Sequence, residues 1–233
     1  MRPFHPAFIL EALVKIVPYI WVTLATMAGT VLFGGLIGVL LASAMIRQKK
    51  IGSAIANTYI YIVRCVPPIV MLFIVYYGLP ELLMSIGINI NDIGKWFFVI
   101  VTFSILFSAP MAEVFRSAYL AVDPGQHEAA LAAGMTETEA FFRIVLPQAA
   151  VTALPNFANM LVNLMKEGSL SYTIGMIDVM GKGQLMISLN HGSFSLETYI
   201  ALAIIYWCLT IVLEKGFGKL EEILSRGKQR IRA

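Results

Sequence analysis

Long apolar runs separated by short polar stretches dominate the chain. Each run approaches or exceeds the length of about 20 residues that an α-helix needs to cross the hydrocarbon core of a bilayer. The stretches between the runs contain charged residues, glycines and prolines, which favour helix ends and loops. We therefore predict an all-α integral membrane protein with about five transmembrane helices, at approximately residues 16–46, 55–79, 96–118, 149–167 and 198–215.

Two segments of this pattern have features of their own. Pro67 and Pro68 interrupt the second run. Because proline cannot continue the hydrogen-bond ladder of a helix, we expect a short helix over 55–63 and a span that starts near Ile69. Between the fourth and fifth runs, residues 169–197 mix glycines with polar residues. This segment predicts an outer loop that contains a short interfacial helix.

Basic residues indicate the orientation of the chain in the membrane. The first run is followed by Arg47, Lys49 and Lys50, and the third ends near Arg116. The tail adds Lys215, Lys219, Arg226, Lys228, Arg230 and Arg232. Because basic segments stay on the cytoplasmic side, we place the N-terminus outside and the C-terminus in the cytoplasm. The first run also exceeds the 7–15 apolar residues of a secretory signal, so we interpret it as a retained span.

Small residues recur at a spacing of four in the first run. Gly34, Gly38 and Ala42 lie on one face of the predicted helix, and small residues at this spacing let two helices approach closely. The pattern fits packing within the chain and a contact with a second copy equally well.

Composition and motifs exclude several classes of function. Hydrophobic residues make up 58% of the chain and charged residues 13%, against roughly 45–50% and about 25% in soluble proteins. The net charge of +3 is small, so we expect no nucleic-acid partner. The sequence contains no phosphate-binding G-x-x-x-x-G-K-[ST], no H-E-x-x-H and no paired cysteines. We therefore expect no catalytic residue, no metal and no nucleotide site on this chain.

The polar interval at residues 121–148 should lie in the cytoplasm. Asp123 followed by Pro124 is a typical helix start, and Gly134 can adopt the left-handed conformation that ends a helix. The sequence therefore predicts a first short helix that ends just before Gly134.

A second short helix should follow in the same interval. Thr136 and Glu139 have the spacing of a capping box, and we expect Pro147 to close this helix. The alanine-rich first helix is slim enough to enter a groove on another protein. A solvated hairpin that merely ties two spans together would have the same helix signals.

The interval resembles the EAA motif of the membrane subunits of ATP-binding-cassette importers. The matching residues are Glu128-Ala129-Ala130, then Gly134 after three positions, then Ile144-x-Leu146-Pro147 after nine more. Over nearly its whole length the chain is similar to the polar amino acid permeases of that superfamily. Further matching residues are Arg64 with Pro67, Ala112–Arg116, Pro124–Gln126, Lys166-Glu167 and Ser169-Leu170. The chain departs from the family pattern at Cys65-Val66, Pro110 and Gly168, so we predict no particular amino acid.

The resemblance implies a single transmembrane permease domain, residues 1–233, in the cytoplasmic membrane of a prokaryote. It implies that a separate cytoplasmic ATPase subunit carries ATP and Mg²⁺ and docks on Glu128, Ala129, Ala130 and Gly134. The other implied partners are an extracytoplasmic amino-acid-binding protein, a second copy of the chain or a similar permease, and membrane lipid. An alternative is a membrane sensor that contacts a soluble partner without moving solute.

Polar side chains inside spans are costly and are candidates for the solute path. The candidates are Glu113, Asn159, Asn163, Lys166 and Glu167. Those on the fourth span recur at helical spacing, and Glu113 lies three residues before Arg116, with which it could pair. The alternative is that the asparagines only join helices and that Lys166 and Arg116 mark the membrane edges.

Overall fold

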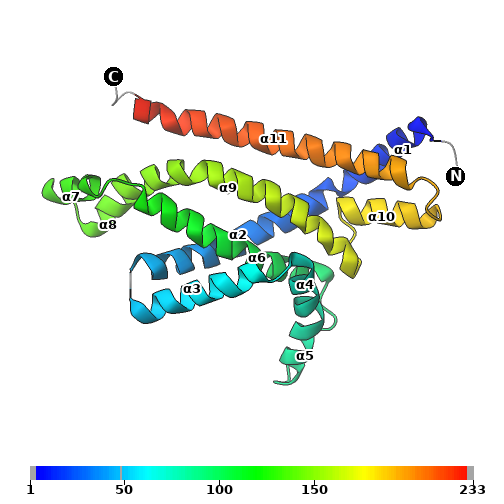
Figure 1. The fold of residues 1–233 in the computed structure, drawn as a ribbon, viewed down its shortest axis with the longest axis horizontal. Coiled ribbons are helices and arrows are strands. Elements are labelled where there is room, and N and C mark those ends of the chain that lie inside the picture. The colour runs from blue at the N-terminus through cyan, green and yellow to red at the C-terminus, as the bar shows by residue number, and fades with distance from the viewer. Residues whose placement is uncertain (1–3, 48, 230–233) are drawn as a thin grey trace.

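The computed structural model describes residues 4–47 and 49–229, without the side chains of residues 226–229. These parts form helices and turns and contain no strand, which confirms the all-α prediction. Figure 1 shows the helices as an elongated bundle. Arg230 and Arg232 of the predicted basic tail lie outside the described residues, as do the side chains of Arg226 and Lys228.

Within the described parts, four continuous helical stretches are long and apolar enough to cross a membrane. They are Pro6–Ile46, Lys95–Leu120, Glu137–Ile174 and Ser195–Ser225. The helices in them are α1 (Pro6–Ile16), α2 (Ile20–Ile46), α6 (Lys95–Leu120), α8 (Glu137–Ala140), α9 (Leu146–Gly168) and α11 (Ser195–Gln229, which extends past its stretch). The first stretch begins at Pro6, before the predicted start at residue 16. Ala12 and Ile16 in this earlier part are buried in an apolar cluster.

A bent pair of helices accounts for the second apolar run and would make a fifth span. Its parts are α3 (Lys50–Cys65), α4 (Pro68–Phe73), a π turn (Ile74–Gly78) and α5 (Leu79–Met84). Val66 and Pro67 have extended ψ angles of 125° and 139°, because a residue before proline avoids the helical region. The axis therefore bends by 104°, at the proline pair where the sequence predicts a helix break.

The central core forms where α2 crosses α6. A Cβ atom added to Gly34 would lie 2.9 Å from the Ser104 carbonyl oxygen, and one added to Gly38 would lie 3.1 Å from Met111 Cβ. Only glycine permits this approach at Gly34, because the neighbouring atom belongs to the backbone. The small residues of the first run thus serve packing within the chain, which decides between the two alternatives that the sequence leaves open.

A second core joins both ends of the chain around α10 (Val179–Leu189). Val179 and Met186 are buried with Ala12 and Ile16 of α1 and Leu202 of α11. α10 occupies the connection where the sequence predicts a short helix, and its buried face packs it into the bundle.

The segments expected on one side of the membrane lie toward the same end of the bundle (Figure 1). These are the connection from α2 to α3, the interval between α6 and α9, and the C-terminal end of α11. The N-terminus and α10 lie toward the opposite end. The three segments thus share one end of the bundle, and their placement in the cytoplasm stays a prediction from the basic residues.

Candidate functional site

The polar interval folds into a hairpin of two short helices, α7 (Pro124–Ala132) and α8, at one end of the bundle (Figure 1). The Asp123 side chain caps α7 by accepting a hydrogen bond of 2.8 Å from the Gly125 N–H. Pro124 takes the first helical position, where its missing N–H leaves no hydrogen bond unmade. This helix start agrees with the sequence prediction.

Gly134 makes the turn of the hairpin. Its φ of +88° is a left-handed conformation that other residues adopt only with strain. The Met135 N–H donates to the Ala130 carbonyl at 3.1 Å, and the Gly134 N–H donates to Leu131 at 2.9 Å. These two bonds form a Schellman motif, so the last carbonyls of α7 are satisfied within the hairpin.

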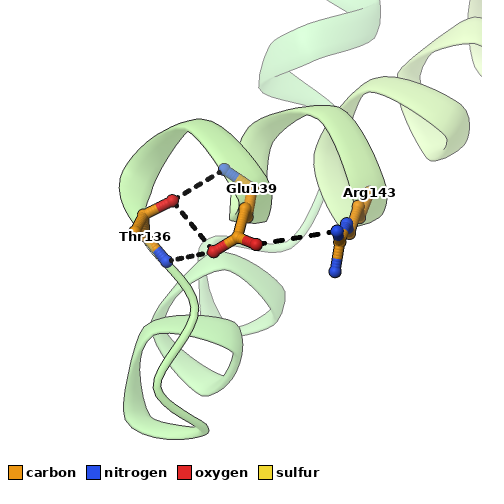
Figure 2. Close-up of polar contacts among 3 residues, drawn as sticks. All are labelled: Thr136, Glu139 and Arg143. Atoms are coloured by element: carbon orange, nitrogen blue, oxygen red, sulfur yellow. Dashed lines mark hydrogen bonds and ion pairs between the residues drawn. The ribbon is translucent and has the colours of Figure 1, made fainter.

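The second helix begins with the predicted capping box (Figure 2). The Glu139 N–H donates to Thr136 Oγ1 at 3.3 Å, and the Thr136 N–H donates to Glu139 Oε2 at 3.1 Å. The other carboxylate oxygen of Glu139 lies 3.6 Å from Arg143 Nη2. Two backbone donors are thus satisfied reciprocally, which fixes the direction in which α8 leaves the turn.

A side-chain hydrogen bond that the sequence does not reveal joins the two helices. His127 Nε2 of α7 lies 2.9 Å from Glu137 Oε2 of α8. The residues are ten positions apart, and only the fold of the glycine turn brings them together. The helix caps and this contact between α7 and α8 therefore hold the hairpin in one shape.

The residues expected to dock on a partner divide between two faces of the hairpin. Glu128, Ala129 and Gly134 are exposed, whereas Ala130 is only 7% exposed. Among the described residues, Glu128 has no ion-pair partner. The hairpin thus presents an unpaired carboxylate beside small side chains, while Ala130 packs on its inner side.

The hairpin is joined to α9 without a break, contrary to the expectation that Pro147 closes α8. Residues Phe141–Val145 form a π turn, in which the Leu146 N–H donates to the Phe141 carbonyl five residues back. The wider turn places Pro147 at the second position of α9, where its missing N–H is tolerated. Gln148 Nε2 then donates to the Ile144 carbonyl at 3.0 Å. The chain therefore runs from α8 into α9 as one helical stretch, with no loop between them.

The polar residues of α9 form one exposed stripe. Asn159, Asn163, Lys166 and Glu167 are all exposed, whereas Leu161, Leu164 and Met165 on the other face are buried. In the described part of the chain, no hydrogen bond or ion pair joins the stripe to Glu113. The stripe is thus continuous along α9, but the described part of this chain does not enclose it as a path for a solute.

Glu113 pairs with Arg64 of α3, and the expected pairing with Arg116 is wrong. The distance between Arg64 Nη1 and Glu113 Oε2 is 2.7 Å. Because α3 packs on α6, Arg64 comes closer to Glu113 than Arg116 does, although Arg116 lies only one helical turn away on the same helix. Both side chains remain about half exposed.

The chain matches the family model described as binding-protein-dependent transport system inner membrane component over residues 34–216. It is 39% identical over 214 residues to the L-cystine transport system permease protein TcyL of Bacillus subtilis, with coverage of 91% of this chain and 88% of that protein. It is 31% identical over 216 residues to the histidine/lysine/arginine/ornithine transport system permease protein HisQ of Salmonella typhimurium, with coverage of 90% and 92%.

Solved structures show the same fold. A chain in the crystal structure of an amino acid ABC transporter with histidines superposes with a TM-score of 0.79 at 28% identity, with coverage of 95% of this chain and 99% of that chain. A chain of the MetNI methionine ABC transporter in an inward-facing conformation superposes with a TM-score of 0.71 at 17% identity, with coverage of 91% and 97%. The second similarity is one of fold alone.

Proposed function

The chain belongs to the family of binding-protein-dependent transport system inner membrane components, and we propose that it is the transmembrane subunit of an ATP-driven importer of polar amino acids. It is a multi-pass protein of the prokaryotic cytoplasmic membrane. Proteins similar to it over most of their length are permeases for cystine and for basic amino acids. These relatives support an amino acid as the solute.

The observation that carries the proposal is the hairpin with its exposed Glu128 and Ala129. The hairpin is folded by its own hydrogen bonds. Binding to a partner therefore does not cost the conformational entropy of ordering a loop. Because α8 continues into α9, movement of the hairpin tilts a span that packs on α6 and α11. We propose that closure of a separate ATPase displaces the hairpin and so alternates the access of the solute path.

ATP and Mg²⁺ belong to the ATPase subunit in this proposal, and the permease binds no cofactor. The sequence contains no phosphate-binding loop, and the candidate site offers a protein-docking surface. In this proposal ATP hydrolysis acts on this chain through the hairpin, with Glu128, Ala129 and Gly134 at its exposed surface and Ala130 supporting them from the inner side.

The α9 stripe supports a further permease chain in the assembly. Exposed asparagine, lysine and glutamate side chains on a spanning helix are costly when they face lipid. A second copy or a similar permease, placed over Asn159, Asn163, Lys166 and Glu167, would enclose them in a water-filled path together with Glu113. An extracytoplasmic binding protein would deliver the amino acid to that path, and lipid would cover the apolar outer faces.

Reconstitution tests the proposal directly. The permease, its ATPase and its binding protein are placed in proteoliposomes, and accumulation of each of the twenty labelled amino acids is measured with ATP and without it. We expect ATP-dependent accumulation of at least one polar amino acid. Normal assembly with no accumulation of any amino acid would contradict the proposal and favour a sensor.

A further inference from the structure

A large cavity lies between α2, α6 and the joint of α8 with α9, next to the hairpin. Its volume is about 540 Å³, within the range of roughly 300–1,000 Å³ that is typical of small-molecule sites. The lining residues include Ala42 and Ser43 of α2, Arg47 directly after it, Phe115 and Tyr119 of α6, and Ala150 of α9. None of the roles described above uses this cavity.

The cavity exists because alanines line its floor. Ala42, Ala118, Ala149 and Ala153 are buried there with exposed fractions of 3–8%. Ala118, Ala149 and Ala153 pack together in one apolar cluster between α6 and α9, and their short side chains leave the space above them open. The rim is aromatic, with the rings of Tyr119 and Phe141 6.4 Å apart between centroids. The interior therefore suits a slender apolar group.

One cationic residue marks the edge of this apolar space. Arg47 is exposed, and among the lining residues it is the one that carries a charge. It has no ion-pair partner in the part of the chain that the structure describes. Lys49 and Lys50, two and three positions further along the chain, are also exposed. The charge at the mouth of the cavity thus favours an anionic group whose tail is apolar.

We propose that this cavity binds one acyl chain of an anionic phospholipid from the leaflet on the side of the hairpin, with the lipid phosphate on Arg47. Basic pockets between transmembrane helices at the cytoplasmic side recognise anionic headgroups in this way. Ser43 and Tyr119 supply hydroxyl groups in the same lining. Because Phe141 and Leu146 also line the cavity, the lipid would contact the joint through which the hairpin moves α9.

The test uses the complex of the permease with its ATPase in nanodiscs of equal parts phosphatidylglycerol and phosphatidylcholine. Native mass spectrometry of the released complex counts the lipids retained on each permease chain. We expect Arg47→Gln to lower retention of phosphatidylglycerol about fivefold. Lys50→Gln removes a neighbouring charge that does not line the cavity, and we expect it to leave retention at the wild-type level. Ala150→Phe narrows the cavity, and we expect it to lower retention of phosphatidylglycerol, while lipid on the apolar outer faces stays bound.

The alternative occupant is a helix of the second permease, and one labelling experiment distinguishes it. A photo-crosslinking phenylalanine derivative in place of Phe115, which lines the cavity and already carries an aromatic ring, should label lipid in the assembled complex. Labelling of the second permease chain would overturn the proposal. Equal loss of phosphatidylglycerol in Arg47→Gln and Lys50→Gln would also overturn it, because the attraction would then be a general property of the basic surface. Wild-type retention in Arg47→Gln or in Ala150→Phe would do the same.

Discussion

Arg64 and Glu113 are 49 positions apart in sequence, and their side chains meet across α3 and α6 with 2.7 Å between Nη1 and Oε2. The pair links the bent second segment of the chain to the helix at the centre of the bundle. Glu113 is also a candidate for the solute path. The position of its side chain in that path therefore depends on the contact with α3.

Removing either partner of this pair should weaken the packing of α3. Both side chains are about half exposed, and the solute path proposed at Glu113 is filled with water. Water in that path screens the attraction, so we expect a coupling energy of about 0.2–1 kcal/mol. A double-mutant cycle of Arg64→Gln and Glu113→Gln, read from thermal unfolding in detergent, measures it. Additive effects of the two changes would show that the ion pair contributes nothing to stability.

Gly34 and Gly35 offer a matched pair of substitutions on α2. A Cβ atom at Gly34 would lie 2.9 Å from a backbone oxygen of α6, whereas one at Gly35 meets no atom within 4 Å. We expect Gly34→Ala to destabilise the protein by about 1–3 kcal/mol and Gly35→Ala to stay within about 1 kcal/mol of wild type. Thermal unfolding of both variants checks this, and equal stability of the two would refute the close crossing.

Stability should fall as the pH rises through the titration of Asp178. The residue precedes α10 and is buried, and burial raises its pKa to about 6 from 3.8, although hydrogen bonds from Gly181, Asp178 itself, Met180 and Thr23 oppose the shift. The folded state therefore holds the proton more tightly than the unfolded state. The contribution of Asp178 to stability is greatest below pH 4, and on the order of 3 kcal/mol of it is lost by pH 6–7.

Asp178→Asn removes this titration and keeps an oxygen acceptor for the Gly181 N–H, which donates to Asp178 at 2.8 Å. Unfolding midpoints of wild type and variant, measured between pH 4 and pH 7, should therefore diverge as the pH rises. The variant should lack the loss that the wild type shows. Parallel pH profiles would contradict the account of Asp178.

The exposed stripe of α9 should matter for transport and not for folding. A lost hydrogen bond to a charged group corresponds to about a tenfold change in rate or more, and we expect such a decrease in uptake for Asn163→Ala and for Glu167→Ala. Asn57→Ala is a control, because Asn57 is exposed on α3 and bonds to Ser53 of its own helix. If both stripe variants keep wild-type uptake and solute preference while the complex assembles, the stripe does not line the path.

The features predicted correctly from sequence are those whose partners lie a few residues apart. Asp123 caps α7, Gly134 turns the chain, and Thr136 with Glu139 forms a capping box. Each depends on local backbone geometry and on side chains short enough to reach only near neighbours, so the residue order alone determines the contact. The break at Pro67 is of the same kind.

The features that the sequence did not reveal depend on how helices pack. Arg64 reaches Glu113, and His127 reaches Glu137, only after a bend or a turn has brought two helices together. Pro147 was expected to end a helix, but the π turn before it shifts the hydrogen-bond register, and hydrophobic periodicity carries no signal for such a shift. The face to which the α9 stripe points follows from packing in the same way.

The central claim is that the hairpin transmits ATP hydrolysis to the permease, and the coupling ratio of the reconstituted transporter tests it. Glu128→Lys reverses an exposed, unpaired charge, and Gly134→Asp places a side chain at a φ of +88°. Glu81→Lys makes the same charge reversal at an exposed position of α5, far from the hairpin, and serves as the control. The measurement is solute accumulated per ATP hydrolysed, together with the amount of ATPase that co-purifies.

Residues central to an interface contribute most of its binding energy. We therefore expect both hairpin variants to lower ATPase retention or the coupling ratio at least about tenfold. Glu81→Lys should stay at the wild-type level. Wild-type retention and coupling in both hairpin variants would contradict the account.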